Sequence, residues 1–212
     1  MNEFLALYLQ QSVAMFAIID PLGVSAILLS LAPATTTHEQ MKAIAFKSTT
    51  TMVIAFFVVL LTGKFVLMLF GIELDSLRAM GGIVLLLMAI KMVQGNLEPK
   101  NQTPEERAEA KQNHEFAVIP LGIPITFGPG IFATIVIFKA SASGYVDLVA
   151  LTFAFLTVAA LTYLAFRYSL YIRHYLGITG QKIISRLMGL IVGAIAVQFI
   201  VGGVSSLWEK GV

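Results

Sequence analysis

The stretch Ile18-Ile19-Asp20-Pro21-Leu22-Gly23-Val24-Ser25 interrupts an otherwise apolar run that extends from Phe4 to Leu31. A run of that length can cross a bilayer, because a helix needs about 20 apolar residues to span the hydrocarbon core. At its centre, however, lie an ionisable carboxylate, a proline that cannot donate a backbone hydrogen bond, and a glycine. Each of these is costly in lipid unless it is buried in protein or faces a water-filled cavity. We therefore interpret the run as a broken transmembrane helix that carries a candidate binding site.

The composition of the whole chain indicates a multi-pass membrane protein. Of its 212 residues, 58% are hydrophobic and only 12% are charged, and the mean hydropathy is +0.86. Soluble domains contain about 25% charged residues. The net charge of +2 gives no reason to expect a nucleic-acid partner, and the lack of cysteine excludes disulfides and thiolate metal sites. We expect the lipid bilayer as the partner, and no metal or cofactor.

Six apolar stretches predict six transmembrane helices, because none shows the two-residue alternation of a barrel strand. They cover roughly residues 4–31, 42–70, 77–95, 116–139, 146–170 and 183–207. The sequence Met1-Asn2-Glu3 lacks the basic region of a cleavable signal peptide, so we expect the first helix to be retained.

Two polar connections contain signals for helix starts. Thr37 precedes Gln40 by three residues, which is typical of a capping box. The segment Thr103-Pro104-Glu105-Glu106 also has a cap, a proline at the first helical position and first-turn acids. We predict a first three-helix unit at 1–95, a cytoplasmic linker with a short helix at 96–115, and a second unit at 116–212.

The distribution of basic residues predicts the orientation in the membrane. Of the 14 Lys and Arg residues, ten fall in or beside the first, third and fifth connections, and four fall on the other side. Because cytoplasmic loops carry the excess of positive charge, both termini are expected outside the cytoplasm. The ten cytoplasmic residues are Lys42, Lys47, Lys91, Lys100, Arg107, Lys111, Arg167, Arg173, Lys182 and Arg186.

The two units resemble each other in sequence. The segment from Arg78 to Val84 matches the segment from Arg186 to Val192 at five of seven positions, with an offset of 108 residues. The same offset pairs Pro21 with Pro129, so that a proline interrupts the first and fourth helices at corresponding places. A second similarity, between 69–72 and 175–178, has an offset of 106.

This repeat predicts an all-α fold of two inverted three-helix repeats, with helices 1 and 4 broken near the midplane. Three helices are an odd number, so the second repeat must enter the membrane in the opposite orientation. Inverted repeats with broken helices at corresponding positions are typical of secondary transporters. A duplicated bundle without transport is the plainer alternative, and a simple kink is the plainer interpretation of each break.

Two half-helices, which begin at Pro21 and Pro129, would present unpaired N–H groups and about half a positive charge each, suited to a carboxylate. Asp20 either caps its half-helix or carries a coupling H⁺ or Na⁺, and the sequence does not choose between these roles. An ionised Asp20 would attract an ammonium group, which suits a small zwitterionic solute. The predicted substrate-binding residues are Asp20, Pro21, Gly23, Ser25, Thr126, Gly128, Pro129, Gly130 and Thr134.

Three motifs resemble those of the MarC family of bacterial and archaeal membrane proteins. They are the segment from Phe16 to Gly23, the segment from Val118 to Pro124, and Gly128-Pro129-Gly130. The resemblance covers essentially the whole chain, although Val24-Ser25-Ala26 stands where a second proline often follows the first motif. It implies a six-helix protein of the prokaryotic cytoplasmic (inner) membrane that transports small neutral amino acids such as glycine or alanine. A homo-oligomer is compatible with the sequence, which does not determine the oligomeric state.

Other classes of function are less consistent with the residues. The chain has no His-Glu-x-x-His zinc motif and no Gly-x-Ser-x-Gly nucleophile motif, so we do not expect an enzyme. An exporter or a channel for another small solute would need the same broken helices. A non-transporting membrane scaffold would not need them. The leading hypothesis is therefore a secondary transporter with a site between the two breaks.

Overall fold

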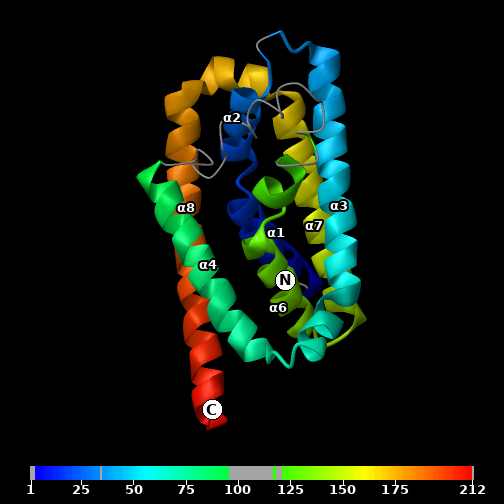
Figure 1. Cartoon of the computed structure of the whole chain (residues 1–212), viewed down its shortest axis with the longest axis vertical. Coiled ribbons are helices and arrows are strands. Elements are labelled where there is room, and N and C mark those ends of the chain that lie inside the picture. Colours follow the sequence, from blue (N-terminus) through cyan, green and yellow to red (C-terminus); the bar gives the residue numbers. More distant parts are fainter. Residues whose placement is uncertain (1–2, 34, 96–116, 118–120, 212) are drawn as a thin grey trace.

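The computed structural model describes residues 3–33, 35–95, 117 and 121–211. The described part of the chain is entirely helical (Figure 1). In chain order its elements are α1 (Glu3–Ile19), α2 (Pro21–Leu31), α3 (His38–Leu69), α4 (Leu74–Gln94), η2 (Leu121–Thr126), α6 (Pro129–Ala140), α7 (Tyr145–Arg167) and α8 (Ser169–Glu209).

Five helical segments are long and apolar enough to cross a membrane. They are Glu3–Leu31 (α1 with α2), His38–Leu69, Leu74–Gln94, Tyr145–Arg167 and Ser169–Glu209. The predicted fourth helix, 116–139, is interrupted as predicted, because Phe127 and Gly128 separate η2 from the 12-residue α6 in its described part. The predicted linker at 96–115, with its short helix, lies outside the described residues.

The broken helices lie in the middle of the molecule. Figure 1 shows α1 and α6 at the centre, with α3 and α7 on one side and α4 and α8 on the other. Accordingly, 61% of the most apolar window of Glu3–Leu31 is buried, against 28% in α3, α4 and α8. The outer helices therefore expose apolar side chains such as Leu61, Phe65 and Leu190, as a lipid-facing surface requires.

Local sequence signals account for several of the helix ends. The predicted capping box is confirmed: Gln40 N–H donates to Thr37 Oγ1 at 3.3 Å, and Thr37 N–H donates to Gln40 Oε1 at 2.8 Å. Gly71 adopts a φ of +63° in the turn between α3 and α4, a conformation that glycine adopts at no steric cost.

The last helix differs from the prediction. A helix was expected over 183–207, but α8 begins at Ser169 and reaches Glu209. The polar residues before 183 were interpreted as a connection, whereas they continue the helix around a bend at Gly177, whose φ is +63° and ψ is 178°. Glycine tolerates that backbone conformation, so one residue redirects the chain without a long loop.

Small residues allow α4 and α8 to pack closely. A Cβ built on Gly82 would lie 2.7 Å from the Ala196 carbonyl oxygen, and one built on Gly203 would lie 2.6 Å from the Ala79 nitrogen. Backbone therefore meets backbone along this pair. This is the arrangement expected where small residues line a helix–helix contact in a membrane.

Candidate functional site

The break between α1 and α2 is confined to one residue. Asp20 N–H still donates to the Phe16 carbonyl at 2.9 Å, and the Asp20 carbonyl already accepts from Val24 N–H at 2.9 Å. Pro21 cannot donate to the preceding turn and disfavours right-handed helical geometry at Asp20. Asp20 adopts the left-handed region instead, with φ 46° and ψ 65°, and is the only non-glycine residue with positive φ in the described chain.

The side chain of Asp20 is the N-cap of α2, as one of the two predicted roles required. Gly23 N–H donates to Asp20 Oδ1 at 3.2 Å. Aspartate tolerates the left-handed region better than most residues because its short polar side chain bonds locally. Asp20 is 5% exposed, so a carboxyl group lies deep inside a membrane-spanning segment. A buried ionisable group at that place is a functional candidate by default.

Helix α8 supplies the neighbours of this carboxyl group. Ser185 lies beside Asp20 Oδ2, and a Cβ built on Gly23 would overlap both Asp20 Oδ2 and Ser185 Oγ. Only glycine therefore leaves the carboxylate and the hydroxyl in their places over the first turn of α2. This close approach explains why the first motif needs its glycine at this position.

Gln181 and Ser185 lie four residues apart and so on one face of α8. Gln181 Nε2 donates to Ser25 Oγ at 3.1 Å and approaches the Leu22 carbonyl at 3.5 Å. Ser25 in turn donates to that carbonyl at 2.6 Å. We call the four side chains Asp20, Ser25, Gln181 and Ser185 the polar cluster.

Three oxygens of the polar cluster make no hydrogen bond of regular geometry among the described residues, although Ser185 Oγ faces the Asp20 carboxyl group closely enough to interact with it. They are Asp20 Oδ2, Gln181 Oε1 and Ser185 Oγ. Gln181 is 1% exposed and Ser185 is fully buried, so neither side chain is open to bulk solvent. Buried polar atoms are usually paired, and an unpaired one costs roughly 1–3 kcal/mol. Three such oxygens at the contact between α2 and α8 therefore require an explanation.

The second break is wider and runs from Ile123, inside η2, to Gly128, just before α6. Ile123, which precedes a proline, is extended at φ −137° and ψ 129°, and Phe127 N–H donates to the Gly122 carbonyl in a π-type bond of 3.0 Å. Helix α6 then begins at Pro129, as predicted, after an extended Gly128 that offers no side-chain cap.

The predicted polar residues of the second break do not join the polar cluster. Thr126 donates to the Leu121 carbonyl at 2.6 Å, and Thr134 donates to the Gly130 carbonyl at 2.8 Å, so both hydroxyls bond within their own segments. Gly130 packs on α4, where a Cβ would lie 2.8 Å from Leu85 Cδ2.

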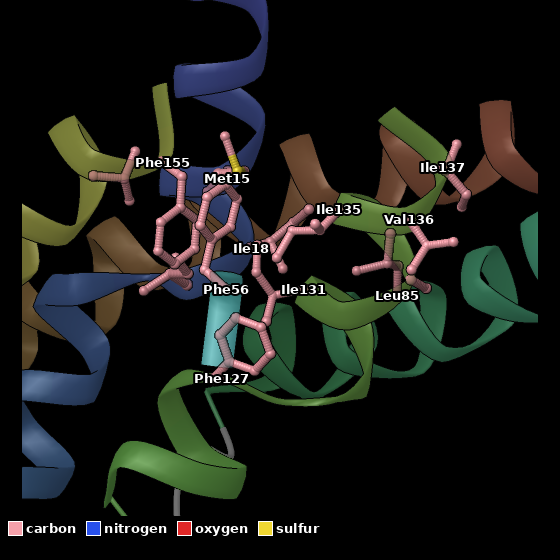
Figure 2. Close-up of a cluster of buried hydrophobic side chains, with 14 of the residues drawn as sticks. Met15, Ile18, Phe56, Leu85, Phe127, Ile131, Ile135, Val136, Ile137 and Phe155 are labelled. Atoms are coloured by element: carbon pink, nitrogen blue, oxygen red, sulfur yellow. The ribbon is translucent and has the colours of Figure 1, made fainter. Parts of the chain in front are cut away.

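Apolar side chains fill the space between the two breaks. The same Cβ position on Gly130 is 3.8 Å from Ile18 Cγ2, which places the end of α1 against the start of α6. Figure 2 shows Ile18, Phe127 and Ile131 pointing toward one another. The structure thus brings the two breaks together through an apolar contact, with the polar cluster on the α8 side.

Gln181 and Ser185 were not predicted as site residues from the sequence. They lie in or beside the stretch that was interpreted as a cytoplasmic connection, and their partners are more than 150 residues away in the chain. Their spacing of four residues was the available signal, but it needs a helix that begins before 183. No group of three or more His, Asp or Glu side chains in the described part of the chain is arranged to hold a metal ion.

Several helices of membrane-spanning length, a lipid-facing apolar exterior and two broken helices at the centre define a multi-pass integral membrane protein. Within that class, the chain belongs to the MarC family of integral membrane proteins, whose model matches residues 5–208. The predicted resemblance is therefore confirmed over nearly the whole length.

Relatives come from bacteria and archaea. The chain is 34% identical over 200 residues to the UPF0056 membrane protein YvbG of Bacillus subtilis strain 168, covering 92% of this chain and 93% of the relative. It is 27% identical over 201 residues to YhcE of Escherichia coli K12, covering 95% and 93%. It is 33% identical over 192 residues to MJ1677 of Methanocaldococcus jannaschii, covering 90% and 92%. No solved structure matches the chain.

Proposed function

We propose that this protein is a secondary transporter of small neutral amino acids, of the size of glycine or alanine, and not an enzyme. The observation that carries the proposal is the pair of helix breaks that meet at the centre of the molecule, one of them beside the buried carboxyl group of Asp20. Broken helices that present half-helix ends at a central site are the usual way in which secondary transporters bind small charged solutes.

The helix directions support an inverted repeat. In Figure 1, α1 with α2, α3 and α4 run up, down and up, whereas α6, α7 and the long part of α8 run down, up and down. The contacts follow the same relation: α1 and α2 pack on α7 and α8, whereas η2 and α6 pack on α3, and α6 also packs on α4. Each broken helix thus packs on the outer helices of the other unit.

The paired glycines also support the repeat. The weaker sequence similarity, with its offset of 106, aligns Gly71 with Gly177. Both adopt a φ of +63°, one in the turn before α4 and one in the bend before the long part of α8. A shared backbone conformation at aligned positions is what a duplicated three-helix unit would retain.

The lengths of the half-helices support breaks near the midplane. Helix α2 has 11 residues and α6 has 12. At 1.5 Å per residue these are about 16 and 18 Å long, roughly half of the 30 Å hydrocarbon core. Because they point in opposite directions, each would reach from the centre to a different surface.

The chemistry of the breaks supports a zwitterionic solute. The N-terminus of α6 has no side-chain cap, so its first N–H groups and its partial positive charge suit a carboxylate. Asp20 suits an ammonium group. The proposed site therefore keeps the predicted residues of both breaks, with Thr126 and Thr134 able to act only as acceptors because each hydroxyl donates to its own backbone. The apolar contact of Ile18, Phe127 and Ile131 is the part that must move during alternating access.

Uptake of radiolabelled glycine and alanine into proteoliposomes tests the proposal, with an imposed H⁺ gradient, an imposed Na⁺ gradient or neither. We expect saturable uptake that one gradient accelerates. If no amino acid shows saturable uptake, the transporter hypothesis is wrong. Flux that never saturates would instead support a channel.

Two variants connect the assay to the breaks. Gly130→Leu should abolish uptake, because its side chain would push into Leu85 and Met88, which lie within 2.9 Å of a Cβ there. Gly144→Leu is the matched control, because a Cβ on Gly144 meets nothing within 4 Å. Asp20→Asn keeps a capping oxygen but removes the charge. Unchanged gradient dependence in Asp20→Asn would restrict Asp20 to its role as a cap.

A further inference from the structure

We propose that Asp20, Gln181 and Ser185 form a binding site for one monovalent cation at the contact between α2 and α8. The site is inferred from geometry alone. Which cation occupies it, Na⁺ or the ammonium group of an amino acid, rests on the proposed transport function. Both are positive groups bound by oxygen ligands, so they share the chemistry that the site offers.

The unpaired oxygens are the first argument. Asp20 Oδ2, Gln181 Oε1 and Ser185 Oγ are buried and make no hydrogen bond of regular geometry within the described chain, and the only interaction among them is that of Ser185 with the Asp20 carboxyl group. The amide orientation of Gln181 is fixed by its contacts, because Nε2 faces the Leu22 carbonyl, which can only accept. Oε1 is therefore the free end. A cation bound at this contact would give these acceptors a partner.

The balance of charge is the second argument. The carbonyl end of α1 and the N–H end of α2 meet at Asp20, so their opposite partial charges of about one half nearly cancel. The carboxylate then sets the sign of the site. One carboxylate neutralises one monovalent cation, whereas a divalent ion would leave an uncompensated positive charge in the membrane interior.

The number and kind of ligands are the third argument. Na⁺ is a hard cation that prefers carboxylate, amide and hydroxyl oxygens, as Ca²⁺ and Mg²⁺ do. A primary ammonium group has three N–H donors, which equals the number of free acceptors. The rest of the cluster holds these ligands: Gly23 leaves room for Asp20 and Ser185, and Ser25 fixes the amide of Gln181.

The positions related by the repeat do not form a second such cluster. The offset of 108 pairs Ser25 with Ala133 and Ser185 with Leu77, both of which are apolar. It pairs Gln181 with Glu73, which forms an ion pair with Lys210 at 3.4 Å. The position equivalent to Asp20 is Gly128, which has no side chain. The repeat therefore duplicates the broken helix but not the polar cluster. The protein has one proposed cation site.

Equilibrium binding to the purified full-length protein in detergent tests this inference without any transport. Radiolabelled Na⁺ binding and the thermal unfolding midpoint are measured against choline chloride at constant ionic strength. Parallel titrations use glycine and glycine betaine, whose trimethylated nitrogen has no N–H donor. We expect saturable binding of Na⁺, of glycine or of both, and no effect of betaine through this site.

Ser185→Ala is the most informative variant. Its hydroxyl makes no hydrogen bond of regular geometry within the described chain and interacts only weakly with the Asp20 carboxyl group, so a purely structural serine would tolerate the change. We expect unchanged stability without cation, and cation affinity reduced about tenfold or more. Ser169→Ala is the matched control, because Ser169 is another fully buried serine of α8 with an unpaired hydroxyl, 16 residues from Ser185. The cation affinity of the Ser169→Ala protein should equal that of the parent.

Asp20→Asn should abolish binding, and Gln181→Met, which keeps the volume of the side chain, should weaken it. Saturation by Na⁺ alone identifies a coupling ion, and saturation by glycine but not betaine identifies the substrate ammonium group. Absence of binding by either cation would overturn the inference, and so would equal affinity in Ser185→Ala and the parent. Cation binding without amino-acid uptake would sink the transport proposal and leave this site intact.

Discussion

The substitution Gly23→Ala tests whether the polar cluster is the working part of the molecule. A Cβ at this position would overlap Asp20 Oδ2 and Ser185 Oγ and would lie 2.8 Å from Asp20 Cγ. Both side chains must therefore rotate away. Because the obstructing atoms belong to side chains and not to backbone, α2 and α8 can keep their positions.

Gly23→Ala has two opposing effects on the free energy of unfolding, and they nearly cancel. Alanine in place of glycine stabilises a helix by up to about 1 kcal/mol. Movement of Asp20 breaks its bond to Gly23 N–H, a capping interaction worth about 1 kcal/mol. The net change should stay within roughly 1 kcal/mol, which corresponds to about 2–4 °C in the unfolding midpoint of a chain of this size.

The functional effect should be large in comparison. We expect Gly23→Ala to lose saturable cation binding and amino-acid uptake while its unfolding midpoint stays close to that of the parent. Gly193→Ala is the control, because its Cβ would make only an ordinary 3.6 Å contact with Ala89 Cβ. If the Gly23→Ala protein binds and transports like the parent, the polar cluster is not required for either activity.

Two further predictions concern the frame that holds the site. Gly203→Ala should lower the free energy of unfolding by roughly 1–3 kcal/mol relative to Gly193→Ala, because its Cβ would lie 2.6 Å from the Ala79 nitrogen. Equal midpoints of the two variants in thermal unfolding would contradict the described α4–α8 contact. Thr37→Ala should cost about 1 kcal/mol by the same measurement, because it removes the capping box of α3, whereas Thr35→Ala, a change at an exposed residue outside the helix, should cost less than the error of the measurement.

Most of the architecture could be predicted because it follows from local chemistry. Apolar length predicts spanning helices, and the structure confirms five of them by length. Proline at 21 and at 129 predicts where α2 and α6 begin, because proline cannot donate to the preceding turn. The cap of α3 follows from the side chains of Thr37 and Gln40 alone.

Other features needed the fold. The bend at Gly177 could not be separated from a loop, because a helix with polar residues near the membrane surface resembles a connection in sequence. The threonines near the second break were predicted as ligands, yet Thr126 and Thr134 bond to their own backbone. A hydroxyl can turn inward or outward on a helix, and only packing decides its direction.

The sequence by itself determined that the chain spans a membrane, where two of its helices break, and that a carboxyl group lies at one break. These outcomes depend on solvation and on the backbone geometry of single residues. The tertiary structure alone decided what faces that carboxyl group, because Gln181 and Ser185 reach Asp20 and Ser25 only after α8 packs on α2. A polar site between segments that are distant in the chain depends on how the helices pack, so no local sequence pattern predicts it.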